Sequence, residues 1–393
     1  MLRDACNRVT QRFDSERMIP QVICYCDTDL VHAAYVTTGL IELADAGEIE
    51  LKLRLRAPRP SSPRSVWTIW LQVHNGVDEY GVCIDSHDLP QFHCPVGLAA
   101  CRYYFKTNID VSTRNAFPSQ HLAKLRAFGP YLPVRPLHER SLSLRRWGCF
   151  YAKARARLLS PRAITSPIAT TMHLADDLLR RRRRYLARKV WADYEEPPGS
   201  DATSTATGSP IIFNPTCWEE SEGSAIRALN EERAELILAL RKALGDRFVG
   251  GFRRSETALT KYPDAVESNT LSHDAYIALI HSTPIAVYTN GKWGCFSWRL
   301  LELFATSKCI VSLPIPCDAG TALDESVGVH QCPDVAAVVD KLRELDANPD
   351  RVRESRYRAW HYYTTQMRPI ARMRRLLTES MQVEPQRQMV EQP

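Results

Sequence analysis

Short apolar runs alternate with amphipathic segments along the second half of the chain. The runs predict strands, and the segments in which apolar residues recur at helical spacing predict helices. Strands are predicted at 211–213, 247–252, 284–289 and 309–315, and helices at 225–244, 273–282, 297–305 and 334–345. Most of these strands are apolar throughout instead of alternating, which is typical of a parallel sheet covered on both faces. The second half is therefore predicted to be a Rossmann-like domain.

The first half follows a similar but less regular pattern. Strands are predicted at 21–26, 48–55, 66–73 and 80–85, and helices at 31–44 and 92–101. Beyond Arg140 the pattern weakens and the chain becomes basic. We expect a second Rossmann-like αβα domain, so that the whole chain has an α/β fold.

A stretch rich in Pro, Gly, Ser and Thr at 195–210 separates the two halves and predicts a linker or long loop. The predicted organisation is an N-terminal domain at 1–196, a linker at 197–209, a C-terminal domain at 210–349, a long helix at 350–378 and a flexible tail at 379–393. Open parallel sheets bind ligands at the carboxyl ends of their strands, and ligand sites are common between domains. We therefore expect a ligand in a cleft between the two domains.

Composition changes this picture little. A length of 393 residues suits two domains, at about 100–200 residues each. The net charge of +6 fits an anionic ligand, an anionic membrane surface or nucleic acid, and equally a slightly basic protein that binds none of them. The 12 cysteines include no pair of C-x-x-C motifs, and several lie in apolar runs, so we expect buried, reduced thiols.

The sequence offers no sign of secretion or membrane insertion. Residues 1–17 are polar and lack the apolar core of a signal peptide, and no apolar run approaches the ~20 residues that span a bilayer. We expect a cytoplasmic protein, either soluble or peripheral on the inner face of a membrane.

The segment 291–302 carries the clearest candidate chemistry, because a glycine-bearing loop there joins a strand to a helix. Ser297 is placed to cap that helix, and free N–H groups at a helix start favour phosphate. Arg299 opposes the helix dipole in the first turn, which an anionic ligand would explain. Glu302, one turn later, can accept hydrogen bonds from sugar hydroxyls. The alternative is a capped core helix with an exposed arginine and glutamate.

Several motifs around this segment resemble those of one enzyme family. They are Arg247-Phe-Val-Gly-Gly-Phe252, Tyr276-Ile-Ala-Leu-Ile280, Ala286-Val-Tyr-Thr-Asn-Gly291, Ser297-Trp-Arg-Leu-Leu-Glu302 and Cys309-Ile-Val-Ser312. Together they look like the C-terminal domain of GT-B glycosyltransferases, especially the bacterial family-1-type and exostosin-like enzymes. The resemblance covers about residues 207–315 and extends into the first half through Thr38-Gly-Leu-Ile-Glu-Leu43 and Tyr103-Tyr-Phe-Lys106.

The resemblance implies a GT-B fold, in which two Rossmann-like domains face each other across a cleft and the C-terminal helix crosses back. It also implies transfer of a sugar from a nucleotide-diphosphate sugar to an acceptor hydroxyl, with the donor on the C-terminal domain. Glu302 matches the family's acidic residue that holds the ribose or donor sugar, and Arg299 a basic position that faces the diphosphate. The chain departs from the family at Gly294, where retaining members with a Glu-x7-Glu motif carry the first glutamate, and at Thr216, where a basic residue is common.

The donor-binding residues expected on these grounds are Gly250, Gly251, Arg254, Gly291, Lys292, Ser297, Trp298, Arg299 and Glu302. Gly250 and Gly251 match a glycine turn near the donor. We expect no metal and no other cofactor, because arginines, lysines and helix N-termini can stabilise the leaving diphosphate. Asp27-Thr-Asp29 follows the first predicted strand and is not expected to bind a metal.

The acceptor side is expected in the N-terminal domain, at the end of the strand that ends in Asp85-Ser-His-Asp88. His87 or Asp88 could take the proton of an acceptor hydroxyl, and Glu302 completes the candidate catalytic set. The alternative is a strand-end turn held by Asp and Ser side chains. Lys106 either contacts an anionic acceptor or lies in solvent.

Five consecutive arginines, Arg180–Arg184, form a concentrated positive patch. Such a patch can bind anionic lipid, or it can be a solvated surface. Binding to lipid suits a lipid-linked acceptor, while a glycan acceptor is the other expectation. Nucleic acid is an unlikely partner, because the chain lacks aromatic base-stacking motifs. The alternative function is a non-catalytic GT-B-like or basic protein that binds lipid or nucleic acid through this patch. The aromatic cluster 360–363 in the predicted tail helix is expected to pack against the rest of the chain.

Overall fold

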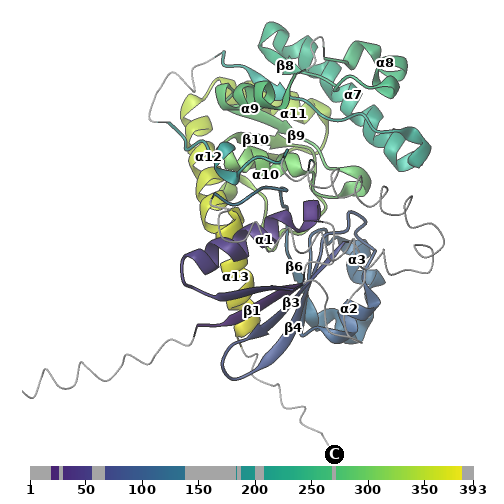
Figure 1. Ribbon diagram of the computed structural model, residues 1–393. Coiled ribbons are helices and arrows are strands. Elements are labelled where there is room, and N and C mark those ends of the chain that lie inside the picture. The colour runs from purple at the N-terminus through teal and green to yellow at the C-terminus, as the bar shows by residue number, and fades with distance from the viewer. Residues whose placement is uncertain are drawn as a thin grey trace, which may run out of the picture.

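The apolar runs of the second half form one parallel sheet, which lies in the upper part of Figure 1. A computed structural model describes residues 19–25, 30–54, 67–137, 183, 187–199, 208–267 and 271–382. The strands of this sheet are β7 (Ile211–Phe213), β8 (Phe248–Gly250), β9 (Ile285–Tyr288), β10 (Cys309–Ser312) and β11 (Val329–Gln331), in the order β11-β10-β9-β7-β8. Both β9 and β10 are buried along their whole length. The predicted Rossmann-like domain is confirmed, with β11 as an additional edge strand.

Helices cover both faces of this sheet, each beginning at a polar cap or a glycine. They are α7 (Ser224–Leu244), α8 (Glu256–Lys261), α9 (His273–Ser282), α10 (Trp298–Ala305) and α11 (Val335–Asp346). Ser272, Ser297 and Asp334 accept backbone N–H groups at the starts of α9, α10 and α11. The apolar stripe predicted for α7 is buried, including Leu236 and Leu240.

The first half forms a six-stranded sheet in the order β2-β1-β3-β4-β5-β6. Its strands are β1 (Gln21–Tyr25), β2 (Glu50–Arg54), β3 (Thr68–His74), β4 (Glu79–Asp85), β5 (Tyr103–Lys106) and β6 (Leu125–Ala127). The sheet is mixed, because β3 runs antiparallel to both of its neighbours. The connection 75–78 is a tight turn in which Asn75 accepts the N–H groups of Val77 and Asp78, and so short a connection can join only antiparallel strands.

Three helices accompany this sheet: α1 (Leu30–Asp45), α2 (Pro95–Ala100) and α3 (Val111–Ala116). The helix predicted at 92–101 is shorter than expected, because Pro95 occupies its first turn and Cys94 before it is extended. Strands β4, β5 and β6 are mutually parallel, so their carboxyl ends lie at one edge of the sheet.

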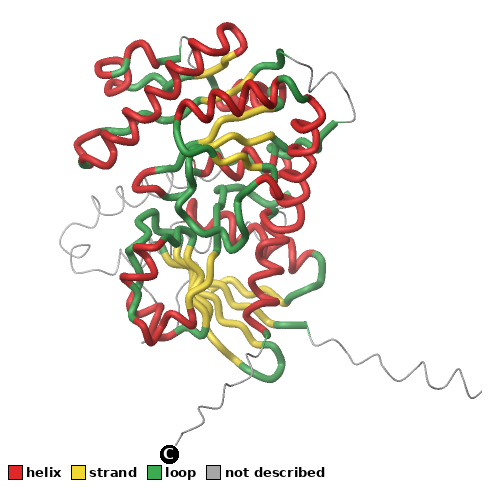
Figure 2. Tube along the Cα trace, turned by 180° about the vertical axis from the view of Figure 1, so that it is seen from behind, coloured by secondary structure: helices red, strands yellow, loops and turns green. Residues whose placement is uncertain are grey.

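The predicted helix at 350–378 is two helices instead of one. The first, α12 (Pro349–Tyr362), packs against α10, α11 and β10 of the C-terminal domain. A π-helical turn at Tyr363–Met367 follows, and α13 (Pro369–Met381) then packs along α1 of the N-terminal domain (Figures 1 and 2). The break falls at Arg368, because the residue before a proline is pushed out of the helical conformation. The expected return of the C-terminal helix onto the N-terminal domain is confirmed.

The return depends on a close helix contact at Gly39 of α1. A Cβ atom there would lie 2.2 Å from the carbonyl oxygen of Pro369, far inside van der Waals contact. Only glycine allows α1 and the start of α13 to approach this closely.

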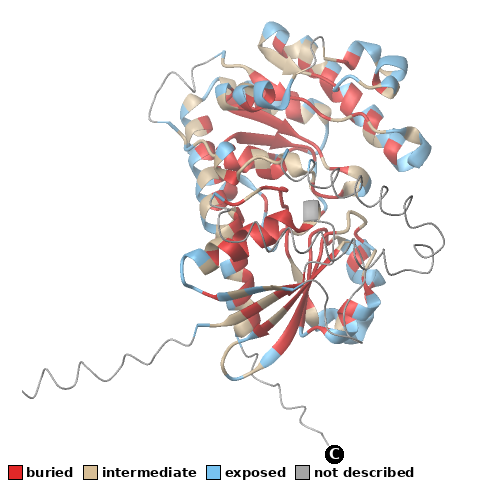
Figure 3. Cartoon of the chain, in the orientation of Figure 1, coloured by how far each residue is buried: buried red, intermediate tan, exposed pale blue. Residues whose placement is uncertain are grey.

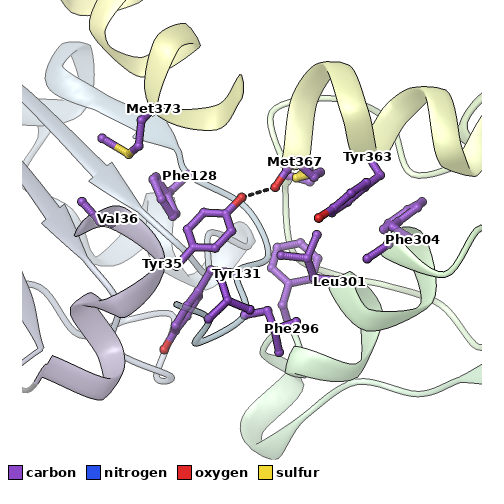
Figure 4. Packing of buried hydrophobic residues seen from close by; sticks show 14 of the residues in the cluster. Tyr35, Val36, Phe128, Tyr131, Phe296, Leu301, Phe304, Tyr363, Met367 and Met373 are labelled. Carbon is purple, nitrogen blue, oxygen red and sulfur yellow. Dashed lines mark hydrogen bonds between the residues drawn. The ribbon is translucent and has the colours of Figure 1, made fainter. Parts of the chain in front are cut away.

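The apolar core runs continuously from one domain into the other beside this contact (Figures 3 and 4). Tyr35 and Phe128 of the N-terminal domain lie against Tyr363 and Met367 of the connecting turn, with Leu301 of α10 beyond them. The Tyr35 hydroxyl donates to the carbonyl oxygen of Met367. The expected packing of the aromatic cluster 360–363 is borne out, since Tyr362 and Tyr363 are buried.

The nine described cysteines are all free thiols and all buried. Their expected role as small buried apolar residues is therefore confirmed for the described part of the chain. Asp27, Asp29 and Arg180–Arg184, apart from Arg183, lie outside the described residues. Of the predicted tail, the first residues belong to α13, and 383–393 lie outside the described residues as well.

Candidate functional site

The order of the C-terminal sheet creates a switch point between β7 and β9. From β7 the chain moves outward to β8, and it then returns to the other side of β7 to form β9. The loops that follow β7 and β9 consequently diverge at the carboxyl edge, which is where open α/β sheets bind ligands. The segment 291–302 lies in the second of these loops and in the helix α10 behind it.

Arg299 and Glu302 lie one turn apart on α10 and form an ion pair, with Nη1 3.2 Å from Oε2. Their side chains are only 19% and 12% exposed. The Arg299 guanidinium carbon lies 3.9 Å from the centre of the Tyr276 ring, and Nη2 donates to the carbonyl oxygen of Asn214 at 3.1 Å. Burial lowers the pKa of Arg299 to about 10, while Glu302 acts in the opposite direction, so the guanidinium stays charged at neutral pH. The structure thus places both residues together at the carboxyl edge.

Arg253 reaches the same place from the loop after β8. Its Nε donates to Asn214 Oδ1 at 3.2 Å, and its guanidinium carbon lies 5.5 Å from the centre of the Tyr276 ring. The Asn214 amide donates in turn to the Gly251 carbonyl oxygen at 3.1 Å and to the Glu267 carboxylate. Burial raises the pKa of Glu267, while the Asn214 hydrogen bond and the nearby arginines lower it. The loops after β7 and β8 therefore meet α10 around Asn214.

The loop before α10 uses most of its own N–H groups within the protein. Gly291 N–H donates to the Cys295 carbonyl oxygen at 2.7 Å, Phe296 N–H to Asn108 Oδ1 at 2.9 Å and Ser297 N–H to the Tyr288 hydroxyl at 3.0 Å. Ser297 caps α10 as predicted, accepting the Arg299 N–H at 3.4 Å. The free N–H groups predicted at this loop are therefore largely occupied, and cationic side chains carry the capacity to bind an anion.

Lys292 already has an anionic partner. Its ammonium lies 2.5 Å from a Glu222 carboxylate oxygen and 4.3 Å from the centre of the Trp218 ring. The following residue, Trp293, has φ +55°, an unusual conformation for a bulky side chain, and it is partly exposed. Contact between Lys292 and a diphosphate would require the ammonium to leave Glu222.

Gly250 and Gly251 have a structural reason to be glycine. Both have positive φ values, +135° and +137°. A Cβ on Gly250 would lie 2.1 Å from the Phe213 carbonyl oxygen, and one on Gly251 would lie 2.8 Å from that of Ala265. The close packing of β7, β8 and their loops explains these glycines without a ligand.

Two of the predicted donor residues lie away from the arginine cluster. Arg253 and Arg254 are both exposed, but only Arg253 of the two bonds to a described residue of the cluster, so it takes the position expected for Arg254. Trp298 is turned toward the N-terminal domain, where its ring lies 6.1 Å from that of His32 and 6.2 Å from that of Tyr131. The guanidinium carbon of Arg188, in the N-terminal domain, lies 5.3 Å from the Trp298 ring centre.

Some of the buried polar atoms that lack a hydrogen bond in the described part of the chain belong to the candidate site or its neighbours, and others lie elsewhere in the fold. Those near the site on the C-terminal side are Trp218 Nε1, Asn290 Oδ1 and Arg299 Nη1, the last close to Glu302 but poorly aligned with it. On the other side they are Lys106 Nζ and Arg188 Nε. Such atoms are rare in folded proteins and commonly mark a place that a ligand or water completes.

His87 and Asp88 follow β4 on the N-terminal side. The Nδ1 atom of His87 accepts the Leu89 N–H at 3.0 Å, which puts the proton of the neutral ring on Nε2. His87 therefore has no free lone pair with which to accept a proton. Burial lowers its pKa, and Lys106 adds to that effect against the opposing charge of Asp85.

Asp88 is the better-placed base of the two. It is half-buried, and its carboxylate makes no hydrogen bond or ion pair with any described residue. Burial raises its pKa, while the positive charges of Lys292 and Lys106 lower it. Of these two charges, that of Lys292 in the loop before α10 has the larger effect. A partly buried carboxylate with a raised pKa is a suitable general base near neutral pH.

Lys106 does not lie in solvent, so that sequence expectation is wrong, while the expected contact with an anionic acceptor stays a prediction. Its side chain is fully buried, with Nζ 3.6 Å from Asp85 Oδ2. Asp85 also accepts the Tyr104 hydroxyl at 2.6 Å and the His87 N–H at 2.9 Å. The carboxyl ends of β4 and β5 bring this pair together beneath the segment that carries Asp88.

Asn108 links the two halves of the candidate site. Its Oδ1 accepts the Phe296 N–H at 2.9 Å across the domain boundary, and its Nδ2 donates to the His87 carbonyl oxygen at 3.2 Å. Beside it, the Asp318 N–H donates to the Ile109 carbonyl oxygen at 2.6 Å. The segment that holds Asp88 and the loop that precedes α10 are thereby fixed relative to each other.

The described residues include no group of three His, Cys, Asp or Glu side chains that could hold a metal ion. Within the same residues, no helix is both long and apolar enough to cross a bilayer.

No protein-family model matches the sequence, and no curated protein sequence matches it. Among solved structures it is similar to WaaG, a glycosyltransferase involved in lipopolysaccharide biosynthesis, with 11% identity over 88% of this chain and 95% of that chain and a TM-score of 0.34. It is also similar to sucrose-phosphate synthase from Thermosynechococcus elongatus (12% identity, 88% and 92% covered, TM-score 0.33) and to TarM (10%, 79% and 63%, TM-score 0.33). Scores this low assign no role to any residue. The chain's own architecture, two Rossmann-like domains with a returning C-terminal helix, is that of the GT-B fold.

Two residues of this site escaped the sequence analysis as site residues: Arg233 and Asn108. Arg233 could have been found, because it lies on the stripe of α7 that also carries the buried Ile226 and Ile237. A charged residue on a buried stripe requires a partner or a function. Asn108 carries no such local signal.

Proposed function

We propose that this protein is a glycosyltransferase that moves a sugar from a nucleotide-diphosphate sugar to an acceptor hydroxyl without a bound metal. The observation that carries the proposal is the gathering of Arg233, Arg253 and Arg299 with Glu302 at the switch point of the C-terminal sheet. Three arginines with only two nearby carboxylates, Glu302 and Glu267, leave an excess of positive charge that suits a diphosphate joined to a hydroxyl-rich group. Asp88, in the other domain, is the proposed base.

In the proposed reaction, the bond between the anomeric carbon and the diphosphate oxygen breaks as a bond to the acceptor oxygen forms. The acceptor's proton passes to Asp88, and the nucleoside diphosphate leaves with the electron pair of the broken bond. Arg299 and Arg253 neutralise the charge that develops on the diphosphate, and Glu302 accepts hydrogen bonds from donor hydroxyls. A base opposite the donor implies inversion at the anomeric carbon, which agrees with the absence of a glutamate at Gly294.

The acceptor is assigned to the N-terminal side on the same reasoning. Aromatic rings of Trp67, Phe92, Tyr131 and Trp298 surround the segment that carries Asp88. Aromatic walls with a few polar groups are typical of sites for organic ligands, including glycan or lipid-linked acceptors. Cytoplasmic location and contact with an anionic membrane through Arg180–Arg184 remain part of the proposal.

A thermal-shift screen with UDP-, GDP- and TDP-sugars tests the donor, and a transfer or donor-hydrolysis assay with Glu302→Ala tests the site. Glu302 holds Arg299 as well as the donor, so we expect turnover to fall by about 100-fold or more. Glu354→Ala is the control, because Glu354 pairs only with Arg358 on the exposed face of α12. Turnover unchanged in Glu302→Ala would refute the assignment.

The rival proposal is a non-catalytic binding protein. No response to any nucleotide, together with tight, salt-sensitive binding to anionic vesicles or RNA, would support it.

A further inference from the structure

Arg233 is a buried cation directly beneath the switch point. It lies in the middle of α7 and is only 3% exposed. Burying a charged side chain is costly unless an opposite charge compensates it. Arg233 forms no ion pair with any carboxylate in the described ranges, and burial lowers its pKa to about 10, so it remains charged.

Neutral groups from both diverging loops surround the guanidinium. Nη1 donates to the Thr216 carbonyl oxygen at 2.6 Å, in the loop after β7. Nε donates to Thr289 Oγ1 at 3.0 Å and Nη2 to the Asn290 carbonyl oxygen, both in the loop after β9. One side chain thus holds the two loops of the switch point in a fixed relation.

A second cation lies close to this one. The charge of Arg233 contributes to the lowered pKa of Arg299, which means that the two guanidinium groups repel each other. Arg299 has Glu302 as an ion-pair partner. The charge of Glu232 raises the pKa of Arg233, but no ion pair joins them, so the positive charge under the loops in which a donor would lie is only partly offset.

A purely structural clamp would not need that charge. Arg241 of the same helix also donates to backbone carbonyl oxygens, those of Val266, Asp264 and Gly250, but it is partly exposed and its charge is hydrated. Burial alone does not imply a ligand, because Arg372 is buried to the same degree and forms no ion pair with any described residue. Arg233 differs in binding both loops of the switch point, and this position points to an anion at the carboxyl edge.

We infer that Arg233 is a positioning residue of the donor site, which fixes the loops after β7 and β9 and supplies from beneath a positive charge that the diphosphate of the donor neutralises. The inference rests on the proposed function. On this inference, Arg233 acts only on the anionic part of the ligand, because its side chain is too buried to contact the nucleoside.

Isothermal titration calorimetry with the full chain separates charge from structure. The probes are UDP and GDP, followed by the nucleoside of whichever binds the wild-type protein, and inorganic pyrophosphate. The variants are Arg233→Gln, which keeps a hydrogen-bond donor and loses the charge, and Arg233→Lys, which keeps the charge. The control is Arg356→Gln, because Arg356 is equally buried but donates to the Ser307 carbonyl oxygen at the opposite edge of the sheet.

At an effective dielectric constant near 20, losing a unit charge about 8 Å from a single negative charge weakens binding by about 30-fold, so nucleoside-diphosphate binding should weaken by at least about 30-fold. We expect this loss in Arg233→Gln, with nucleoside binding unchanged, and binding within about fivefold of wild type in Arg233→Lys. The control should bind as the wild type does.

An equal loss of nucleoside and nucleoside diphosphate in Arg233→Gln would reduce Arg233 to a structural clamp and overturn the inference. Undiminished diphosphate binding would also overturn it, while the proposed function would stand. If Arg233→Gln does not fold, Arg233→Lys decides, because loss of diphosphate binding with the charge retained contradicts the inference. If neither UDP nor GDP nor pyrophosphate binds the wild-type protein, and TDP-sugars give no thermal shift either, the proposed function fails and the inference falls with it.

Discussion

Replacing Lys106 with methionine tests the buried pair under the candidate base. The methionine side chain resembles the aliphatic part of the lysine side chain in length and apolar character, but it lacks the ammonium that lies 3.6 Å from the Asp85 carboxylate. Both side chains are 0% exposed, so water cannot replace the lost partner. Breaking a fully buried ion pair from one side costs about 3–5 kcal/mol of unfolding free energy.

The contacts that remain in the variant refine this magnitude. Asp85 keeps the hydrogen bonds from the Tyr104 hydroxyl and from the His87 N–H, which continue to stabilise its carboxylate. We therefore expect a loss near the lower end of the range, about 3 kcal/mol. The double variant Lys106→Met/Asp85→Asn removes both charges and should recover at least half of this loss, which measures the coupling of the pair.

Equilibrium urea unfolding followed by circular dichroism measures these differences. Asp78→Asn is the matched control in the same domain, because the Asp78–Arg102 pair is similarly close at 3.2 Å but about 40% exposed on both sides. An exposed pair of this kind contributes at most about 1 kcal/mol. If Lys106→Met costs no more than Asp78→Asn, or if the double variant is less stable than the single one, the reasoning is refuted.

Two further predictions concern pH. Lys292→Met should move the acid limb of the kcat/KM profile to higher pH, because Lys292 lowers the pKa of Asp88 and the proposed base must be ionised to act. An acid limb that does not move would show that Lys292 has no effect on the pKa of the base. Glu42→Gln should stabilise the protein at pH 8 relative to wild type by about 1 kcal/mol more than at pH 5, measured by urea unfolding at both values. Burial raises the pKa of Glu42 to about 7, against the hydrogen bond from Trp191, so the folded state binds the proton more tightly than the unfolded chain. The stability that this proton contributes is full below the unfolded pKa and is lost as pH rises through about 7; an equal effect of the substitution at both pH values would contradict this account.

Elements governed by local pattern were predictable from the sequence. The apolar runs of β9 and β10 and the stripe of α7 depend on neighbouring residues alone, and they form where expected. The break before Pro369 was missed, because one helix was predicted at 350–378, although a proline disfavours the helical conformation of the residue before it. The antiparallel course of β3 was less accessible, because it depends on how a four-residue turn closes.

The site shows the limit of such reasoning more clearly. Arg299 and Glu302 were identified because they share one helix turn, and the structure brings them together. Their partners Asn214, Arg253 and Tyr276 come from three other connections and meet only when the sheet forms. Lys106 was misjudged for the same reason, because its burial depends on an aspartate on the adjacent strand.

Hydrogen–deuterium exchange of the full chain, with and without the nucleoside diphosphate that the screen selects, tests the central claim most directly. The account predicts slower exchange of amides in 289–299 and 214–218, the two loops that diverge at the switch point, when the nucleotide is present. Unchanged exchange in both loops under saturating nucleotide, or protection confined to other segments, would contradict a donor site at this edge of the sheet.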